Sequence, residues 1–320
     1  MSARLKRGIQ VVLVCLVLLT ELLPAFPDAP LTIVVVLSRD ITPYRQALKG
    51  FEQVMKESGR GYKLHELVSE GYTADAAGLV GKVRARRPDL ILTIGSHATS
   101  AISDGIRDIP IVFSLVLPSS GNGALQGLSG ARGNITGASM EIPLKTQFAK
   151  MREVLPEVRH IGVLYDPAVT GPLVEIAATT AKEMGLDLVA ISVESEKDVV
   201  SNIDALGDKV DVLWSVADST VFSPKGLERI LLATLRSRIP FVGLSPAFVK
   251  AGALLALSVD YQDVGRQSGE QSLRILSGED PSHVPIAVPR NISLSVNMNT
   301  AMQIQVQIQE KVRRQAELFF

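Results

Sequence analysis

The chain has 320 residues, 33 of them basic and 33 acidic, so its formal net charge at pH 7 is zero. No long basic stripe runs along the sequence, which argues against nucleic acid as a partner. With a hydrophobic composition of 46%, the chain is long enough for one large domain or for two lobes with separate cores.

The N-terminus has the composition of an export signal. Basic residues within the first seven positions precede an apolar run over 11–19, and no acidic residue comes before Glu21. The run is short for a bilayer span, so residues 1–29 are predicted to be a cleaved signal peptide or, alternatively, an uncleaved N-terminal anchor. A periplasmic or otherwise extracytoplasmic protein is expected.

Cys15 is the single cysteine and lies inside this apolar run. Lipid attachment requires a small residue just before the cysteine, at the end of such a run, and Val14 does not meet that requirement. We therefore expect no lipidation, and no disulfide or thiol chemistry in the exported part.

The first half of the chain alternates between strand and helix patterns. A continuous apolar, β-branched run at 31–37 predicts a strand covered on both faces. Thr42 is expected to cap the next helix, with Pro43 at its first position and apolar residues at helical spacing as far as Gly59. The elements predicted after it are a strand at 62–68, a helix at 73–87, a strand at 90–94, a short helix from His97, a strand at 110–115 and a flexible glycine-rich connection at 119–134.

The alternation restarts in the second half. Pro172 is predicted to open one helix and Ser195 to cap the next. The elements predicted here are helices at 143–155, 172–185, 195–207, 223–237 and 261–277, strands at 159–165, 187–193, 211–216, 240–244 and 253–259, and an extended stretch at 284–296. Residues 301–320 have the pattern of a terminal amphipathic helix that packs on the second lobe or frays, with partner or membrane-surface binding as the alternative. This alternation predicts two parallel sheets flanked by helices.

Short segments along the chain resemble a known family, in order and in spacing. They are PIVF at 110–113, GNITG at 133–137, LP at 155–156, HIGVLYDP at 160–167, DSTV at 218–221, RIP at 238–240, GAL at 252–254, DY at 260–261, VGRQ at 264–267 and ISLSVN at 292–297. They resemble the bacterial ABC-transporter substrate-binding proteins, a family that includes tryptophan and tyrosine receptors. The resemblance covers roughly residues 31–300.

The resemblance implies an α/β fold of the type I periplasmic-binding kind, with two doubly wound parallel-sheet lobes joined by a three-strand hinge. The crossover strands are expected near 136–140, 258–261 and 287–293. The first lobe would comprise 31–138 plus 261–285, and the second 139–258 plus 286–320. A ligand would lie between the lobes, against the carboxyl ends of the strands.

Residues that follow the predicted strands would line this cleft. In the first lobe the candidates are Ser38, Arg39, Tyr44, Ser96, His97, Thr99 and Ser114. The helix start at Ser96 would suit a ligand carboxylate, although Ser96 also fits a simple cap. Arg39 would bind an acidic group or be a solvated surface residue, and Tyr44 would stack on an aromatic ligand or pack on its own helix.

In the second lobe the candidates are Asp218, Ser219, Thr220 and Ser245, with Asp260 at a crossover as a hinge residue or a ligand partner. Asp218 matches a family position that faces the cleft, so it is expected to pair with a ligand ammonium group or, as the alternative, to be a turn or cap aspartate. On the first reading, Asp218→Ala would weaken binding of an amine by more than about tenfold and leave the fold intact. Relatives often have Gly-Asp-Pro where this chain has Ser114 to Pro118, so a cleft carboxylate expected there is absent.

No pattern indicates catalysis. The four histidines have no metal-ligand spacing, no nucleophile elbow surrounds Ser96, and the glycine-rich connection lacks the lysine of a phosphate loop. We expect no catalytic residue, metal or cofactor. The expected function is the solute-binding component of an ABC importer, a monomer that captures an amino acid or related small polar ligand by hinge closure and delivers it to a membrane permease and ATPase. The alternative is a ligand sensor that docks to a membrane signalling protein.

Overall fold

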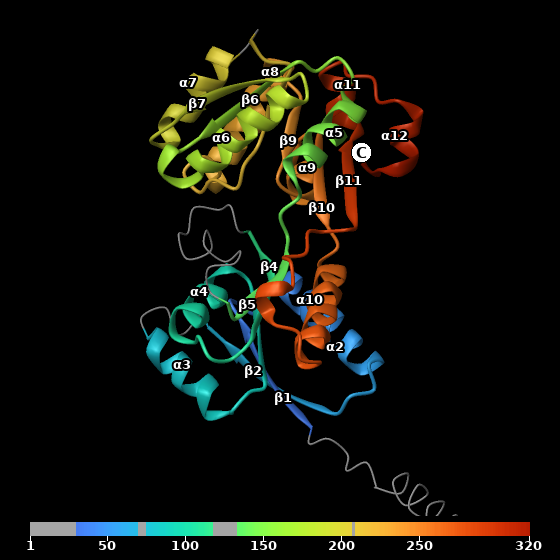
Figure 1. Cartoon of the computed structure of the whole chain (residues 1–320). Helices are drawn as coiled ribbons and strands as arrows, with labels where there is room; N and C mark the ends of the chain where they lie inside the picture. The colour runs from blue at the N-terminus through green and yellow to red at the C-terminus, as the bar shows by residue number, and fades with distance from the viewer. Residues whose placement is uncertain (1–29, 70–74, 118–132, 207–208) are drawn as a thin grey trace, which may run out of the picture.

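The computed structural model describes residues 30–69, 75–117, 133–206 and 209–320, which have the predicted α/β fold class. Two lobes, each built on its own sheet, are joined by a narrow waist (Figure 1). The predicted signal at 1–29 and nearly all of the glycine-rich connection lie outside the described residues. Among the residues that are described, none of the helices has the length and apolar character needed to cross a membrane.

The first lobe contains a five-stranded parallel sheet in the order β2-β1-β3-β4-β5. Its strands are β1 (Leu31–Leu37), β2 (Tyr62–Val68), β3 (Leu90–Ile94), β4 (Ile111–Val116) and β5 (Ile135–Ser139). Helices α2 (Thr42–Glu57) and α10 (Tyr261–Leu276) cover one face, and α3 (Ala76–Ala85) and α4 (Ser96–Gly105) cover the other. Both faces of β1, β3 and β4 are therefore buried, which is why these strands are mainly apolar runs, whereas the edge strand β2 includes charged residues and is only half-buried.

The second lobe contains a seven-stranded sheet in the order β12-β11-β10-β9-β8-β6-β7. Its strands are β6 (His160–Tyr165), β7 (Asp187–Ser192), β8 (Val212–Trp214), β9 (Phe241–Gly243), β10 (Leu255–Val259), β11 (Ile292–Asn297) and β12 (Glu317–Phe319). All neighbours are parallel except β10 and β11. Helices α5 (Leu144–Val154) and α6 (Pro167–Glu183) pack on one face, and α7 (Glu196–Leu206), α8 (Pro224–Arg236) and the short α9 (Pro246–Ala251) pack on the other.

The prediction of one terminal helix at 301–320 is wrong. The segment forms the end of α11 (Met298–Gln303), then α12 (Glu310–Gln315) and the edge strand β12. Ile304, Ile308 and Val312 have helical spacing and are all buried in the second-lobe core, but Gln305 has a φ of +63° and interrupts the helix between them.

Three smaller predictions of element ends are also wrong. Ile41, not Thr42, is the N-cap of α2. Helix α6 starts at Pro167 behind the cap Asp166, and Pro172 lies inside it. The extended stretch 284–296 is a strand only from Ile292, since its first half is a connection between the lobes.

Three connections cross the waist, at the places where the crossover strands were expected (Figure 1). The first leads from β5 to α5 and the second from β10 to α10. The third runs beside β5 before it enters β11, with the Ala287 N–H donating to the Gly137 carbonyl at 2.9 Å. The Thr136 hydroxyl donates to the Val284 carbonyl at 2.7 Å and fixes the start of this connection.

One face of α10 holds this third connection. The side-chain amides of Gln267 and Gln271 donate to the carbonyls of Val288 (2.9 Å) and Pro285 (2.8 Å). Farther along, the Arg290 guanidinium donates to Asp263 at 2.8 Å and to Glu270 at 2.9 Å. These partners raise the pKa of Arg290 above its usual range. These bonds fasten residues 285–290 of the connection to α10, so the part that is not held by α10 begins near Asn291.

We expect Arg290→Ala to lower the free energy of unfolding by about 1–3 kcal/mol, because Asp263 is almost buried and would lose its cationic partner. The measurement is urea denaturation followed by circular dichroism. Arg84→Ala is the control, since the Arg84–Asp108 pair is exposed at 43% and 63% and its loss should change stability much less. Equal losses in the two variants would contradict a structural role for the Arg290 cluster.

Candidate functional site

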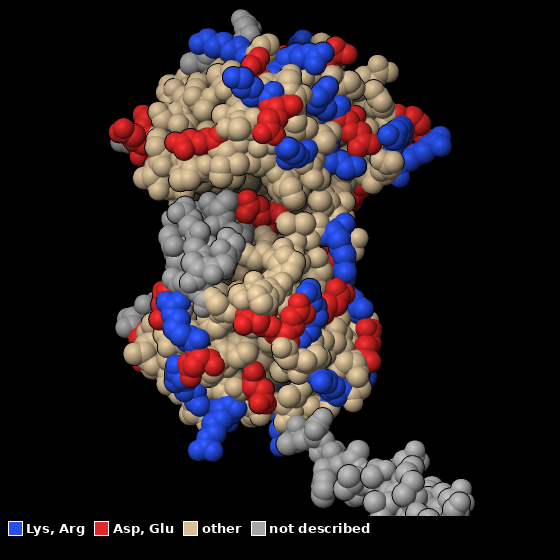
Figure 2. All heavy atoms as spheres, in the orientation of Figure 1, with Lys and Arg blue, Asp and Glu red and all other residues tan. Residues whose placement is uncertain are grey.

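The carboxyl ends of the two sheets face each other across the waist. Strand β5 leaves the first sheet toward the second lobe, and β10 leaves the second sheet toward the first lobe. The other strands of each sheet that run parallel to β5 or to β10 therefore also have their carboxyl ends at the waist. The surface is hollowed there, and acidic side-chain atoms are visible in the hollow (Figure 2). Carboxyl ends of parallel strands are the usual ligand-binding edge of open α/β sheets.

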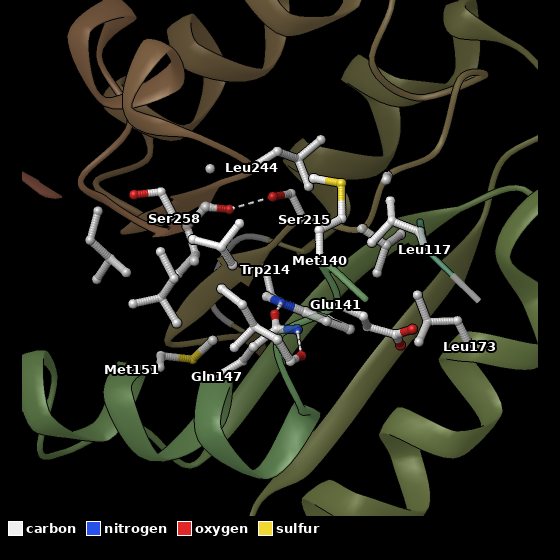
Figure 3. Close-up of a pocket in the computed structure, with 18 of the residues that line it drawn as sticks. Leu117, Met140, Glu141, Gln147, Met151, Leu173, Trp214, Ser215, Leu244 and Ser258 are labelled. Atoms are coloured by element: carbon white, nitrogen blue, oxygen red, sulfur yellow. Dashed lines mark hydrogen bonds between the residues drawn. The ribbon is translucent and has the colours of Figure 1, made fainter. Parts of the chain in front are cut away.

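A pocket with a volume of about 260 Å³ lies at this edge (Figure 3). It is lined by the connection 140–142, by α5 and α6, by residues in or just after β8, β9 and β10, by Tyr261 at the start of α10, and by Leu117 from the first lobe. Most of the lining is apolar. Its polar side chains are those of Glu141, Gln147, Thr170, Ser215, Ser258 and Tyr261. Glu141 is the one charged residue among the described residues of the lining.

One wall of the pocket is the indole of Trp214, which is fixed in place by its neighbours. The Trp214 Nε1–H donates to Gln147 Oε1 at 3.0 Å, and the ring meets Phe148 edge-on with centroids 5.3 Å apart. The Gln147 amide in turn donates to the Ile142 carbonyl at 2.7 Å (Figure 3). The position of the wall is thus tied to the first connection between the lobes.

Asp218 lies behind the pocket and is only 2% exposed. Its Oδ2 accepts from the Asp166 N–H at 2.8 Å and from the Thr170 hydroxyl at 2.6 Å, while Oδ1 accepts from the N–H groups of Thr220 (2.9 Å) and Val221 (3.2 Å). These four donors occupy the carboxylate. Because Thr170 lines the pocket, Asp218 positions a pocket hydroxyl from behind.

Two of the first-lobe candidates converge at Gly95, just before α4. Gly95 has a φ of +89°, and a Cβ added there would lie 2.5 Å from Tyr44 Oη and 2.7 Å from Ser38 Oγ. Ser38 Oγ accepts from the Ala98 N–H at 2.9 Å. Burial raises the pKa of the Tyr44 phenol. The hydroxyls of Ser38 and Tyr44 therefore lie together beside the N-terminal end of α4, where Ser96 begins the helix.

The other candidates of the first lobe differ in exposure. Arg39 and His97 are exposed, whereas Thr99 and Ser114 are buried. The Thr99 hydroxyl donates to the Gly95 carbonyl at 2.9 Å and lies 2.8 Å from the Thr93 hydroxyl. The Ser114 hydroxyl has no hydrogen-bond partner among the described residues.

The second-lobe candidates are mostly engaged with their own lobe. The Thr220 hydroxyl donates to Asp166 Oδ2 at 2.8 Å, and Ser219 is exposed. Ser245 is the N-cap residue of α9, but its side chain accepts no hydrogen bond from the start of the helix. Asp260 caps α10, since its Oδ1 accepts from the N–H groups of Gln262 at 2.9 Å and Asp263 at 3.1 Å.

None of the twelve candidates is among the lining residues of the pocket. Asp218, Ser245 and Asp260 each directly follow a lining residue. Reasoning from strand ends points to the edge of the sheets at which the pocket lies, but it does not say which side chains line the pocket. Glu141 and Trp214 were missed, although Glu141 follows a predicted crossover and Trp214 lies in a predicted strand.

Comparison with known proteins adds a family match. The family model described as ABC transporter substrate binding protein matches residues 31–319. A tyrosine-binding protein from Clostridioides difficile (strain R20291) is 22% identical over 249 residues, which are 75% of this chain and 71% of the relative.

Solved structures share the fold. A domain from Streptococcus pneumonia in complex with L-Trp has a TM-score of 0.66 and 23% identity, covering 91% of this chain and 100% of its own. The ligand-free, open structure of a substrate-binding protein with adhesive properties from Clostridium difficile has a TM-score of 0.74 and 20% identity, covering 90% and 98%. The fold is therefore of the type I periplasmic-binding kind.

Proposed function

The chain belongs to the ABC transporter substrate-binding protein family, and on this basis we propose that it captures an amino acid or a related small ligand for an ABC importer. It would act outside the cytoplasm, as a monomer, and deliver the ligand to a membrane permease and ATPase. The observation that carries the proposal is the pocket at the waist, which is lined by the second lobe, by two of the connections and by Leu117 of the first lobe.

The proposed mechanism is closure of the lobes about the three connections. The moving units would be 31–138 plus 261–285 and 139–258 plus 286–320. A ligand held in the pocket touches the connection 140–142 and residues 258–261, so it contacts the segments that would bend. Contacts made with both lobes favour the closed form over the open one, and this difference in affinity drives the closure.

We propose that the first lobe contributes the edge formed by Ser38, Tyr44 and Ser96. Hydroxyls and backbone N–H groups at the start of a helix suit a carboxylate, because the helix N-terminus attracts anions. The apolar body of the ligand would lie against Trp214 in the second lobe. At about 260 Å³ the pocket is smaller than the roughly 300–1,000 Å³ typical for drug-sized ligands, which favours a single amino acid in size.

A thermal-shift screen of residues 30–320 tests the proposal with amino acids, small carboxylates, sugars and nucleosides. A ligand that binds only the native state raises stability by about 2.7 kcal/mol at a hundred times its Kd, so an amino acid should give a saturable rise in the melting temperature. Leu173→Trp should abolish that rise, because it fills the pocket.

Ile176→Trp is the matched control. Ile176 is on the same helix, 57% exposed, and not part of the lining, so this variant should keep the full ligand response. Absence of stabilisation by any of the four classes would contradict the proposed function. If the ligand still stabilises Leu173→Trp, the ligand binds somewhere other than this pocket.

A further inference from the structure

The end of the first lobe that lies farthest from the waist is rich in basic residues. The strands of this sheet are parallel and have their carboxyl ends at the waist, so the strand starts, and the helix ends that precede them, lie at the opposite end of the lobe. Basic side chains are visible at that end in Figure 2. Six exposed residues form what we call the distal basic surface: Lys56, Arg60, Lys63, Arg86, Arg87 and Arg107.

The charge of the distal basic surface is not neutralised within the lobe. Four other arginines of the first lobe are paired with carboxylates: Arg45 with Asp40 and Glu66, Arg84 with Asp108, Arg266 with Glu57, and Arg274 with Glu279. The six residues of the distal basic surface form no ion pair with any described residue, and Arg60 donates to a carbonyl and a hydroxyl group at the end of α10. The other carboxylates that the structure describes at this end are fewer: Asp89, Asp104 and Asp280. Positive charge is therefore in excess there.

The predicted export segment, residues 1–29, joins the lobe at this same end. Strand β1 starts at Leu31, far from the waist (Figure 1), and the Leu31 N–H donates at 2.9 Å to the carbonyl of Gly61, the neighbour of Arg60. The chain from Leu19, where the apolar run ends, to Leu31 can span no more than about 40 Å. If the segment stays in the membrane as an anchor, it therefore holds the distal basic surface close to the bilayer.

We propose that the distal basic surface binds the anionic phospholipid headgroups of the membrane. The inference rests on the proposed function only for the location of the chain, outside the cytoplasm and beside a membrane transporter. Each basic residue near an anionic membrane surface strengthens binding about fivefold, so a cluster binds without inserting any apolar side chain. The pocket lies at the opposite end of the lobe, so the first lobe can rest on the membrane while the pocket remains accessible to a ligand.

The test measures sedimentation of residues 30–320 with vesicles of phosphatidylcholine alone, or with about one third phosphatidylglycerol. This range contains every strand of both sheets and leaves out the apolar run, which would bind a vesicle by itself. At low salt the chain should bind the anionic vesicles at least about tenfold more strongly than the neutral ones, and at about 1 M salt this binding should be lost to screening. Combined replacement of three residues, Arg86→Glu, Arg87→Glu and Arg107→Glu, should weaken binding to anionic vesicles by about 100-fold or more.

The matched control makes the same change of charge on α12 of the second lobe, with Lys311→Glu, Arg313→Glu and Arg314→Glu, where the three side chains are exposed. It should keep the wild-type binding to anionic vesicles. Circular dichroism shows whether each variant is folded, and if one is not, the lipid and salt dependence of the wild type still decides.

Equal binding of the wild type to the two kinds of vesicle, binding to neither, or an equal loss in the two folded variants overturns the inference. The proposed function is tested separately by the thermal-shift screen. Binding to anionic vesicles without a response to any ligand class would contradict solute capture and leave the membrane contact standing. A ligand response without vesicle binding would do the reverse.

Discussion

Replacement of Gly265 by alanine is expected to lower the free energy of unfolding by about 3 kcal/mol or more. Gly265 lies on α10 where this helix crosses α2, and a Cβ at this position would overlap the backbone carbonyl of Ala47. A backbone group cannot rotate aside as a side-chain tip can. The helices would have to separate, and Phe51 and Val264, which are buried between them and the sheet, would lose contacts.

The same crossing excludes a side chain on the other helix. A Cβ at Gly50 of α2 would overlap the carbonyl of Gln262 on α10, so the two backbones approach each other from both sides. Gly50→Ala should therefore give a loss of similar size. The crossing joins a helix near the start of the chain to one more than 200 residues later, and it places α10 so that it can hold the third connection.

Gly81→Ala is the matched control for Gly265→Ala. Gly81 is in the interior of α3, it is exposed, and a Cβ there would meet no atom within 4 Å. Alanine should stabilise this helix by about 0.5–1 kcal/mol, because it has the higher helix propensity. Chemical denaturation of both variants gives the comparison. Losses of equal size at the two positions would show that the close crossing is not the cause.

Sequence patterns predicted the first lobe well because β1 and β3 are buried along their length, and the edge strand β2 is bounded by turn residues. The bounds of β1, β2 and β3 agree with their apolar or alternating runs. Helix α9 was missed because its six residues are too few to show a helical period. The terminal segment was predicted as one helix because its apolar residues keep helical spacing on both sides of the break at Gln305. A pattern reports which side chains are buried, and not whether the backbone between them is continuous.

The pocket was less predictable for a different reason. Residues just after a strand all lie near the same edge, but their neighbours decide which of them face a ligand. Trp214 reaches the pocket from within β8, whereas Asp218, four residues later, turns back toward α6. That turn depends on donors at Asp166 and Thr170, which are about 50 residues away in sequence. No local signal carries this information.

Asp218→Ala is accordingly expected to lower the free energy of unfolding by about 3 kcal/mol or more. The variant would leave the N–H groups of Asp166, Thr220 and Val221 and the Thr170 hydroxyl without their acceptor, and each buried donor left unpaired costs about 1–3 kcal/mol. This replaces the sequence-based expectation that the variant keeps its fold. Asp218 does not line the pocket, so the variant should lower ligand affinity only indirectly, through displacement of the Thr170 hydroxyl.

Ser219→Ala is the adjacent control, since Ser219 is exposed and its loss should change stability by no more than about 0.5 kcal/mol. Urea denaturation measures stability, and calorimetry at a temperature where each variant is folded measures affinity. If the role of Asp218 is structural, Asp218→Ala should lower the denaturation midpoint strongly and the ligand affinity only weakly. The reverse result, full stability with lost binding of amines, would mean that the Asp218 carboxylate leaves its four donors and binds the ligand.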